Sequence, residues 1–184
     1  MKRPARPITA KYLQNAATFY LERYPSTAEG LRRVLNRRVA KAKMVEAPIM
    51  DNVEQAIAAI VARFVDAGVI DDKAFAQTKA RSLHRRGTST RLTRRKLNLA
   101  GVDGDTLDKA MVALDEELHT NPVTREWRAA VALAKRRRLG PFRLAKDRAD
   151  RRTRDLAAMA RAGFAYDVAK KVIDAKDPDS LDEA

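Results

Sequence analysis

The chain has 184 residues, and its 38 lysines and arginines outnumber the 24 aspartates and glutamates, which gives a formal net charge of +14. It contains no cysteine, which excludes disulfides, thiolate metal ligands and cysteine nucleophiles. No stretch approaches the roughly 20 apolar residues that span a bilayer, and no apolar segment of a secretory signal follows the basic start MKRPARP. We therefore predict a cytoplasmic protein without membrane contact, whose partner is nucleic acid, an acidic protein surface or both.

Apolar residues recur with the 3.6-residue period of amphipathic helices along nearly the whole chain. Aromatic residues make up only 5% of it, which favours thin helices packed through alanine and leucine. Breaks at proline, glycine and capping residues divide the pattern into nine helices in three sets of three. The sequence thus predicts an all-α chain with these parts: a disordered basic N-terminus (1–8), three three-helix repeats (9–69, 70–120 and 121–175) and an acidic C-terminal tail (176–184), the last frayed from residue 177.

The first set is predicted to begin with a helix over about 9–24 that turns Phe19 inward. Ser26, with Glu29 three residues later, predicts a capping box for the second helix. The third helix carries Val65 on its inward stripe, and Gly68 suits the left-handed position that follows it.

The second set is predicted to begin at Asp71 or Asp72, either of which can cap a helix that stops at Gly87. Ser89 or Thr90 can cap the following helix, whose arginines are predicted to lie opposite an inward stripe of Thr93, Leu97 and Ala100. The third helix of this set has the clearest spacing, and its predicted core residues are Leu107, Ala110, Met111, Leu114 and Leu118.

The third set repeats the same organisation after Asn121-Pro122. Trp127 falls on the inward stripe of its first helix, and Leu156, Met159 and Ala160 are predicted to line the second. The segments LAGVDGDTLDKAM (99–111) and RAGFAYDVAKKVI (161–173) share an Ala-Gly pair and an aspartate four positions after the glycine. This is an internal repeat, as expected of units too small to be stable alone.

Two basic runs are the candidate binding surface. RSLHRRGTSTRLTRRKL (81–97) has six arginines, one lysine, one histidine and no acid, whereas the acidic residues gather on the next helix. Like charges at helical spacing repel, and no acid in the run offsets this, so a binding surface is favoured over a solvated face. KRRRLGPFR (135–143) holds more cations than a helix C-terminus requires. The candidate residues are Arg81, Arg85, Arg86, Arg91, Arg94 and Arg95 in the first run and Lys135, Arg136, Arg137 and Arg138 in the second.

Other features favour structural roles. Trp127 and Phe142 could stack on bases, but the helical spacing favours the core. Residues 147–154 mix signs and are predicted to be an ordinary solvated helix. The sequence has no Gly-rich phosphate loop, no H-E-x-x-H and no G-x-S-x-G. His84 has no ligand partner at helical spacing, and His119 lies near a predicted helix end. We therefore predict no enzyme activity, no catalytic residue, no cofactor and no metal site.

Four segments, in the same order, resemble the RecX family of regulators of the RecA recombinase: AGVIDDKAFAQTKARSLHRRG (67–87), KLNLAGVDGDTLDKAM (96–111), KRRRLGPF (135–142) and RAGFAYDVAKKVI (161–173). The first set of helices matches less well, because its second joint near Ala42 lacks the glycine. In the second set, Thr93 holds a position where the family has an apolar residue. The resemblance implies three tandem three-helix repeats in an elongated, curved array. It also implies a monomer that binds the RecA–DNA filament and inhibits ATP hydrolysis, strand exchange and filament growth.

The basic, all-helical sequence and the resemblance together leave two function classes open, and the resemblance alone supplies the partner in the first. The first is a protein-binding regulator of the RecA filament, in DNA repair and recombination. The alternative is a helical protein that binds single- or double-stranded nucleic acid directly, with its basic patch on the phosphate backbone. A third and more remote hypothesis is that the protein is a structural assembly factor for ribonucleoprotein.

Overall fold

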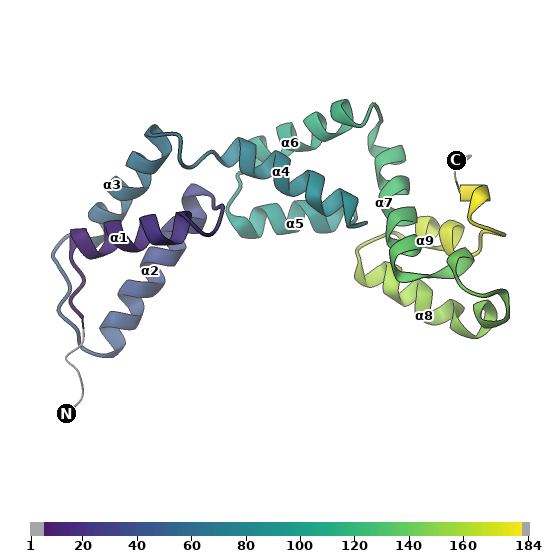
Figure 1. Cartoon of the computed structure of the whole chain (residues 1–184), viewed down its shortest axis with the longest axis horizontal. Helices are drawn as coiled ribbons and strands as arrows, with labels where there is room; N and C mark the ends of the chain where they lie inside the picture. The colour runs from purple at the N-terminus through teal and green to yellow at the C-terminus, as the bar shows by residue number, and fades with distance from the viewer. Residues whose placement is uncertain (1–5, 182–184) are drawn as a thin grey trace. The chain divides into compact units, whose positions relative to one another are not determined.

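The computed structural model describes residues 6–181, which contain nine α-helices and no strand beyond one isolated bridge. This confirms the predicted all-α repeat fold (Figure 1). The α-helices are α1 (Ala10–Leu21), α2 (Ala28–Met44), α3 (Val53–Asp66), α4 (Asp72–Arg85), α5 (Thr90–Ala100), α6 (Gly104–Glu117), α7 (Pro122–Arg137), α8 (Arg148–Arg161) and α9 (Tyr166–Ile173), with short 3-10 helices η1 (Gly140–Phe142), η2 (Ala145–Asp147) and η3 (Asp179–Leu181).

The described chain forms two compact units. The first comprises the residues up to Phe75 together with Leu99–Asp103, and the second comprises Ala76–Asn98 and the chain from Gly104 onward. The end of α5 and the turn that follows it therefore pack with the first unit.

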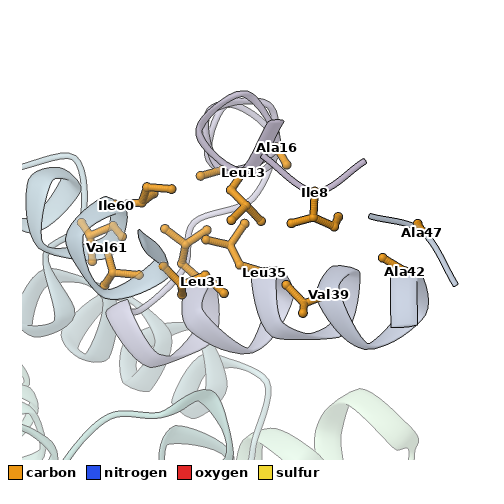
Figure 2. Packing of buried hydrophobic residues seen from close by; sticks show 13 residues of the cluster. Ile8, Leu13, Ala16, Leu31, Leu35, Val39, Ala42, Ala47, Ile60 and Val61 are labelled. Carbon is orange, nitrogen blue, oxygen red and sulfur yellow. The ribbon is translucent and has the colours of Figure 1, made fainter. Parts of the chain in front are cut away.

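The core of the first unit lies between α1, α2 and α3, where the interior leucines of α1 and α2 meet the isoleucines of α3 (Figure 2). Leu13, Leu31 and Leu35 are completely buried, and Ile60 is nearly so. Two inward predictions on this unit are wrong. Phe19 is 52% exposed, with Arg23 stacked 3.8 Å above its ring, and Val65 is 44% exposed.

Order begins earlier than the sequence predicts. Ile8 was expected in the disordered N-terminus, yet it is buried in the first core and forms the isolated bridge with Ile49. Its amide donates to Pro48 O at 2.8 Å, and its carbonyl accepts from Met50 N at 3.0 Å. Residues 1–5 of that expected segment lie outside the described residues.

The second unit contains most of α4 and α5, all of α6, and the cluster of α7, α8 and α9. Leu107, Met111 and Leu114 of α6 are buried as predicted. In α8 the inward face is rotated from the prediction, because Asp155 and Ala158 are buried beside Met159 whereas Ala160 is exposed. Buried Leu181 belongs to this core, so the acidic tail is anchored at least to that residue; residues 182–184 lie outside the described part.

Helix caps follow the local chemistry of the sequence, with one shift. Thr27, not Ser26, caps α2, because its side chain accepts from Gly30 N at 2.9 Å. Ser89 Oγ accepts from Leu92 N at the start of α5, and Asp71 Oδ1 accepts from Ala74 N at the start of α4. Asn121 caps α7 through Val123 and Thr124, so this residue opens the third repeat.

The repeat suggested by the two Ala-Gly segments extends to the buried positions. Leu35, Leu97 and Met159 occupy the same place in the second helix of each repeat, at intervals of 62 residues, and all three are completely buried. In the first helices a completely buried pair recurs four residues apart: Leu13 and Ala17, Ala76 and Ala80, Ala130 and Ala134. The three repeats thus share one internal packing scheme.

The shared Ala-Gly segments are docking points for the preceding repeat. In the first unit, Thr27 Oγ1 donates to Ala100 O at 2.5 Å, and a Cβ added at Gly101 would lie 2.6 Å from Glu29 Cβ. In the second unit, a Cβ added at Gly163 would collide with Ser89 Oγ. At each joint the glycine therefore lies against the residues that begin the second helix of the repeat before it.

An acidic residue completes each joint from the first helix of the next repeat. Asp72 Oδ1 accepts from Ala28 N at 2.9 Å, at the start of α2. Glu126 Oε2 accepts from both the amide and the hydroxyl of Thr90, at 2.7 and 2.6 Å, at the start of α5.

We name the first set of contacts joint 1 (Thr27, Asp72, Gly101) and the second joint 2 (Ser89, Glu126, Gly163). Asp72 thus caps a neighbouring helix, and only Asp71 caps its own.

Candidate partner-binding surface

The first basic run lies at the end of α4 and along α5, within the second unit. Five of its six arginines are exposed, namely Arg85, Arg86, Arg91, Arg94 and Arg95, whereas Arg81 is half-buried. Thr93 and Leu97 form the buried stripe on the other side of α5. The helical spacing therefore predicted correctly which side of α5 carries the charge.

Two of these arginines are already paired with acids of α6. Arg81 Nε lies 2.8 Å from Glu117 Oε2, and Arg94 pairs with Asp108. The expectation that no acid offsets the basic run is therefore wrong, because α6 brings its carboxylates back onto α4 and α5. Arg85, Arg86, Arg91 and Arg95 form no ion pair within residues 6–181, and we call these four residues the free arginine patch.

Gly87 fixes the turn that carries Arg85 and Arg86. Its φ is +66°, and an added Cβ would collide with the backbone of Leu133 in α7. Only glycine allows this left-handed turn to lie so close to another helix. The turn is thereby held on α7, the helix whose C-terminus carries the second basic run.

The second run covers the last turn of α7 and its cap. Lys135, Arg136, Arg137 and Arg138 are all exposed and form no ion pair within the described residues. Arg138 ends the helix in the left-handed conformation, with φ +53°. The following Leu139, Gly140 and Pro141 are buried, and Gly140 lies against the backbone of Ile173 in α9. The four cations thus project from a helix end that is anchored on both sides.

His84 belongs to the first basic run, and its side chain is half-buried. Its burial lowers the pKa below 6.5, and the nearby Arg125 and Arg128 lower it further, against a smaller opposing effect of Asp115 and Glu126. The imidazole is therefore neutral at pH 7 and adds no charge to the surface.

Several arginines of the third repeat have structural roles. Arg143 forms a bidentate ion pair with buried Asp155, with both N–O distances at 2.7 Å, and Asp155 also accepts from Gly140 N. Burial raises the pKa of Asp155, but the bonds from Arg143 and Gly140 outweigh it, and the net pKa is lowered. Arg148 donates to Pro141 O and Lys176 O, and Arg152 pairs with Asp174. Residues 147–154 are therefore more than a solvated helix face.

The two aromatic residues that could stack on bases, Trp127 and Phe142, are engaged in packing. Trp127 is half-buried against the core of the third repeat, and its Nε1 donates to Leu181 O at 3.1 Å. Phe142 packs against the same core. Both rings are therefore used in packing, as the sequence predicted.

The described residues contain no group of three or more histidine, aspartate or glutamate side chains that could hold a metal ion. Across residues 6–181, none of the helices combines the length and apolarity required to traverse a bilayer. What the site offers is guanidinium and ammonium groups on an ordered helical surface, which suits carboxylates or phosphates.

Known proteins with similar sequences carry one name. A family model for the second three-helix domain of RecX matches residues 71–111. The "Regulatory protein RecX" of Myxococcus xanthus is 41% identical over 174 residues, which cover 94% of this chain and 89% of that protein. Its namesake in Agrobacterium fabrum is 29% identical over 162 residues, covering 88% of this chain and 82% of that protein.

Solved structures show the same fold at low sequence identity. The crystal structure of RecX from Lactobacillus salivarius matches with a TM-score of 0.58 at 19% identity, and the match covers 95% of this chain and 97% of that one. A second crystal structure, of regulatory protein RecX, matches with a TM-score of 0.55 at 18% identity, over 90% of this chain and 72% of that one.

Proposed function

Because the chain belongs to the RecX family of regulatory proteins, we propose that it binds the RecA–DNA filament and inhibits RecA ATP hydrolysis, strand exchange and filament growth. Its site of action on RecA is the free arginine patch together with Lys135–Arg138. In this proposal it acts in the cytoplasm as a monomer, without cofactor or catalysis.

The observation that carries this proposal is the free arginine patch itself. Four guanidinium groups stay unpaired within residues 6–181, although carboxylates of α6 lie close enough to pair with Arg81 and Arg94. Like charges held together cost free energy, so an unpaired cluster on ordered helices supports a role in contact with an anionic partner.

A second candidate function is direct binding to the DNA backbone. The same cations favour DNA binding, because arginine forms charge-assisted hydrogen bonds with phosphates as readily as with carboxylates. Trp127 and Phe142 do not support base reading, because both are used in packing. We therefore limit this alternative to contacts with phosphates.

The test is titration of the protein into RecA that is hydrolysing ATP on single-stranded DNA. We expect the natural chain to inhibit hydrolysis, and the triple variant Arg85→Gln, Arg91→Gln, Arg95→Gln to lose that inhibition. The matched control is Arg81→Gln with Arg94→Gln, which removes arginines that α6 already neutralises, and it should inhibit nearly as well as the natural chain. No inhibition by the natural chain at micromolar concentrations would refute the proposal.

Binding to free DNA separates the two functions. If the patch grips phosphates, the triple variant should bind naked DNA more weakly, and the slope of log affinity against log salt should shrink by about 0.9 for each lost contact. If the patch contacts RecA, inhibition should disappear while affinity for naked DNA changes little. Circular dichroism must show that each variant retains its helices.

A further inference from the structure

The turn between α4 and α5 rests on the middle of α7, within the second unit (Figure 1). A Cβ added at Gly87 would lie 2.4 Å from Leu133 N and 2.7 Å from Leu133 Cα, so the turn touches the backbone of α7 itself. Arg85 and Arg86 directly precede this glycine. The contact therefore holds two residues of the free arginine patch against the helix that carries the second basic run.

Two residues of the second run lie on the side of α7 that faces this turn. Arg136 and Arg137 follow Leu133 by three and four residues, a spacing that places side chains on one face of a helix. Helical side chains lean toward the N-terminus, so both arginines lean back toward the turn. Cα–Cα steps and the helical rise then limit the Cα distance from Arg86 to Arg137 to about 14 Å. We call Arg85, Arg86, Arg136 and Arg137 the Gly87 cluster.

The Gly87 cluster has no acid of its own. Its four arginines are all exposed, and none forms an ion pair within residues 6–181. Two acids that reach this part of the unit are engaged elsewhere, because Glu117 pairs with Arg81 and Glu126 accepts from Thr90. Like charges brought together repel one another, so an anion with several charges bound between the two runs would relieve that repulsion.

The side chains around the cluster indicate which anion fits. Guanidinium groups bind phosphate oxygens through paired hydrogen bonds. The exposed residues of the turn and of the end of α7 are all cationic, and they include no aromatic ring and no apolar side chain. Nothing there would recognise a base or an aliphatic group. A linear polyphosphate places several negative charges on one narrow chain, which suits cations that approach from two sides.

We propose that the Gly87 cluster is a binding site for linear polyphosphate, which lies between the turn and the end of α7 and contacts both basic runs at once. The site shares its residues with the proposed contact to RecA. Polyphosphate binding does not depend on that contact, however, and it is measured without RecA, so either proposal can fail while the other stands.

The test is NMR titration of the ¹⁵N-labelled full-length protein with sodium tripolyphosphate, in magnesium-free buffer at constant ionic strength. We expect one ion to bind per chain, with saturable shifts of the amide signals of Arg86, Gly87, Arg136 and Arg137 that share a single midpoint. Orthophosphate should bind much more weakly, because it is too short to contact both runs.

A matched pair of double variants separates this site from general attraction to a basic protein. Arg86→Gln with Arg137→Gln should lower the affinity about four- to twenty-five-fold, the product of two exposed ion pairs of about two- to fivefold each. The control is Arg95→Gln with Lys135→Gln, which also removes one unpaired cation from each run. Arg95 lies farther along α5, and Lys135 lies about 200° around α7 from Leu133, so this control should lose much less affinity.

Three results would overturn the proposal. The first is an equal loss of affinity in the two double variants, which would mean that only net charge matters. The second is a different midpoint for each basic run, which would mean two separate sites. The third is an absence of saturable shifts at millimolar tripolyphosphate. Circular dichroism must show that both double variants keep their helices, as expected for changes at exposed positions.

Discussion

Replacing Gly163 with alanine should be unusually costly, because this glycine meets two requirements at once. Its φ is +92°, a left-handed conformation that costs an alanine about 1 kcal/mol or more. An added Cβ would also collide with Ser89 Oγ, which is buried and caps α5 through Leu92 N. If the serine rotates away, the cap is lost, at about 1 kcal/mol. We therefore expect Gly163→Ala to lower the free energy of unfolding by about 2–3 kcal/mol.

Gly68 provides the matched control. It follows α3 with a φ of +68°, as Gly163 follows α8, but an added Cβ would meet nothing within 4 Å. Gly68→Ala should therefore show only the backbone cost of about 1 kcal/mol. Urea unfolding followed by circular dichroism measures both values, and the transition of each unit is fitted separately if the two do not coincide.

A double-mutant cycle then isolates the contact between the repeats. Ser89→Ala alone should cost about 1 kcal/mol through loss of the cap. In the double variant the collision with Oγ no longer exists, so its cost should fall below the sum of the single costs by about 1 kcal/mol. If the two costs simply add, or if Gly163→Ala costs no more than Gly68→Ala, then the docking of Gly163 on Ser89 is not the reason for the glycine.

Four further outcomes are expected. Met111→Ala should lower the free energy of unfolding by about 2–5 kcal/mol in urea, because Met111 is only 5% exposed. The lowered pKa of Asp155 means that its stabilising contribution is present above the unfolded-state pKa and is lost as pH falls through the folded one. Acid titration of the free energy of unfolding should thus show a smaller loss below about pH 4 in Asp155→Asn than in the natural chain. The C2 proton of His84 should titrate in NMR with a midpoint below 6.5, and a midpoint above 7 would contradict its burial beside arginines. Glu46→Gly should stabilise the first unit by about 0.5 kcal/mol in the same urea assay, because Glu46 is exposed and has a φ of +53°.

The helices and their ends could be predicted because their signals are local. A 3.6-residue period, a capping side chain and a glycine after the last turn all act within a few residues. This is why Thr93 and Leu97, Met111 and Gly68 are found in their predicted places. The wrong predictions concern residues whose burial or pairing depends on a side chain that is distant in the sequence.

Phe19 and Asp155 show two such errors. Phe19 has the spacing of an inward residue, but it lies on the exposed side of α1, where Arg23 covers its ring. Asp155 occupies the place that Leu31 and Thr93 hold in the other repeats, and all three side chains are buried. A carboxylate is tolerated there only because Arg143 and Gly140, from outside the helix, supply three hydrogen bonds. Periodicity within α8 carries no sign of that partner.

The location of the basic surface could be predicted from the sequence, but which of its arginines form ion pairs could not. The sequence showed that the cations gather at 81–97, and the spacing placed them opposite the buried stripe. It did not show that Glu117 and Asp108 of α6 reach Arg81 and Arg94. Those pairs depend on a later helix that packs beside α4 and α5, a contact across 36 residues for Arg81. The structure thereby reduces a six-arginine candidate to the four residues of the free arginine patch.

The joints also explain why the first repeat departs from the glycine pattern. Gly101 and Gly163 are needed because each lies against the beginning of the second helix in the preceding repeat. Within residues 6–181, the end of α2 in the first repeat docks on no preceding repeat. Its last residue, Met44, is 83% exposed, and Glu46 takes the left-handed position that glycine has elsewhere. The Ala-Gly signature is therefore a property of the joint between repeats and not of the three-helix unit, so three repeats show it only twice.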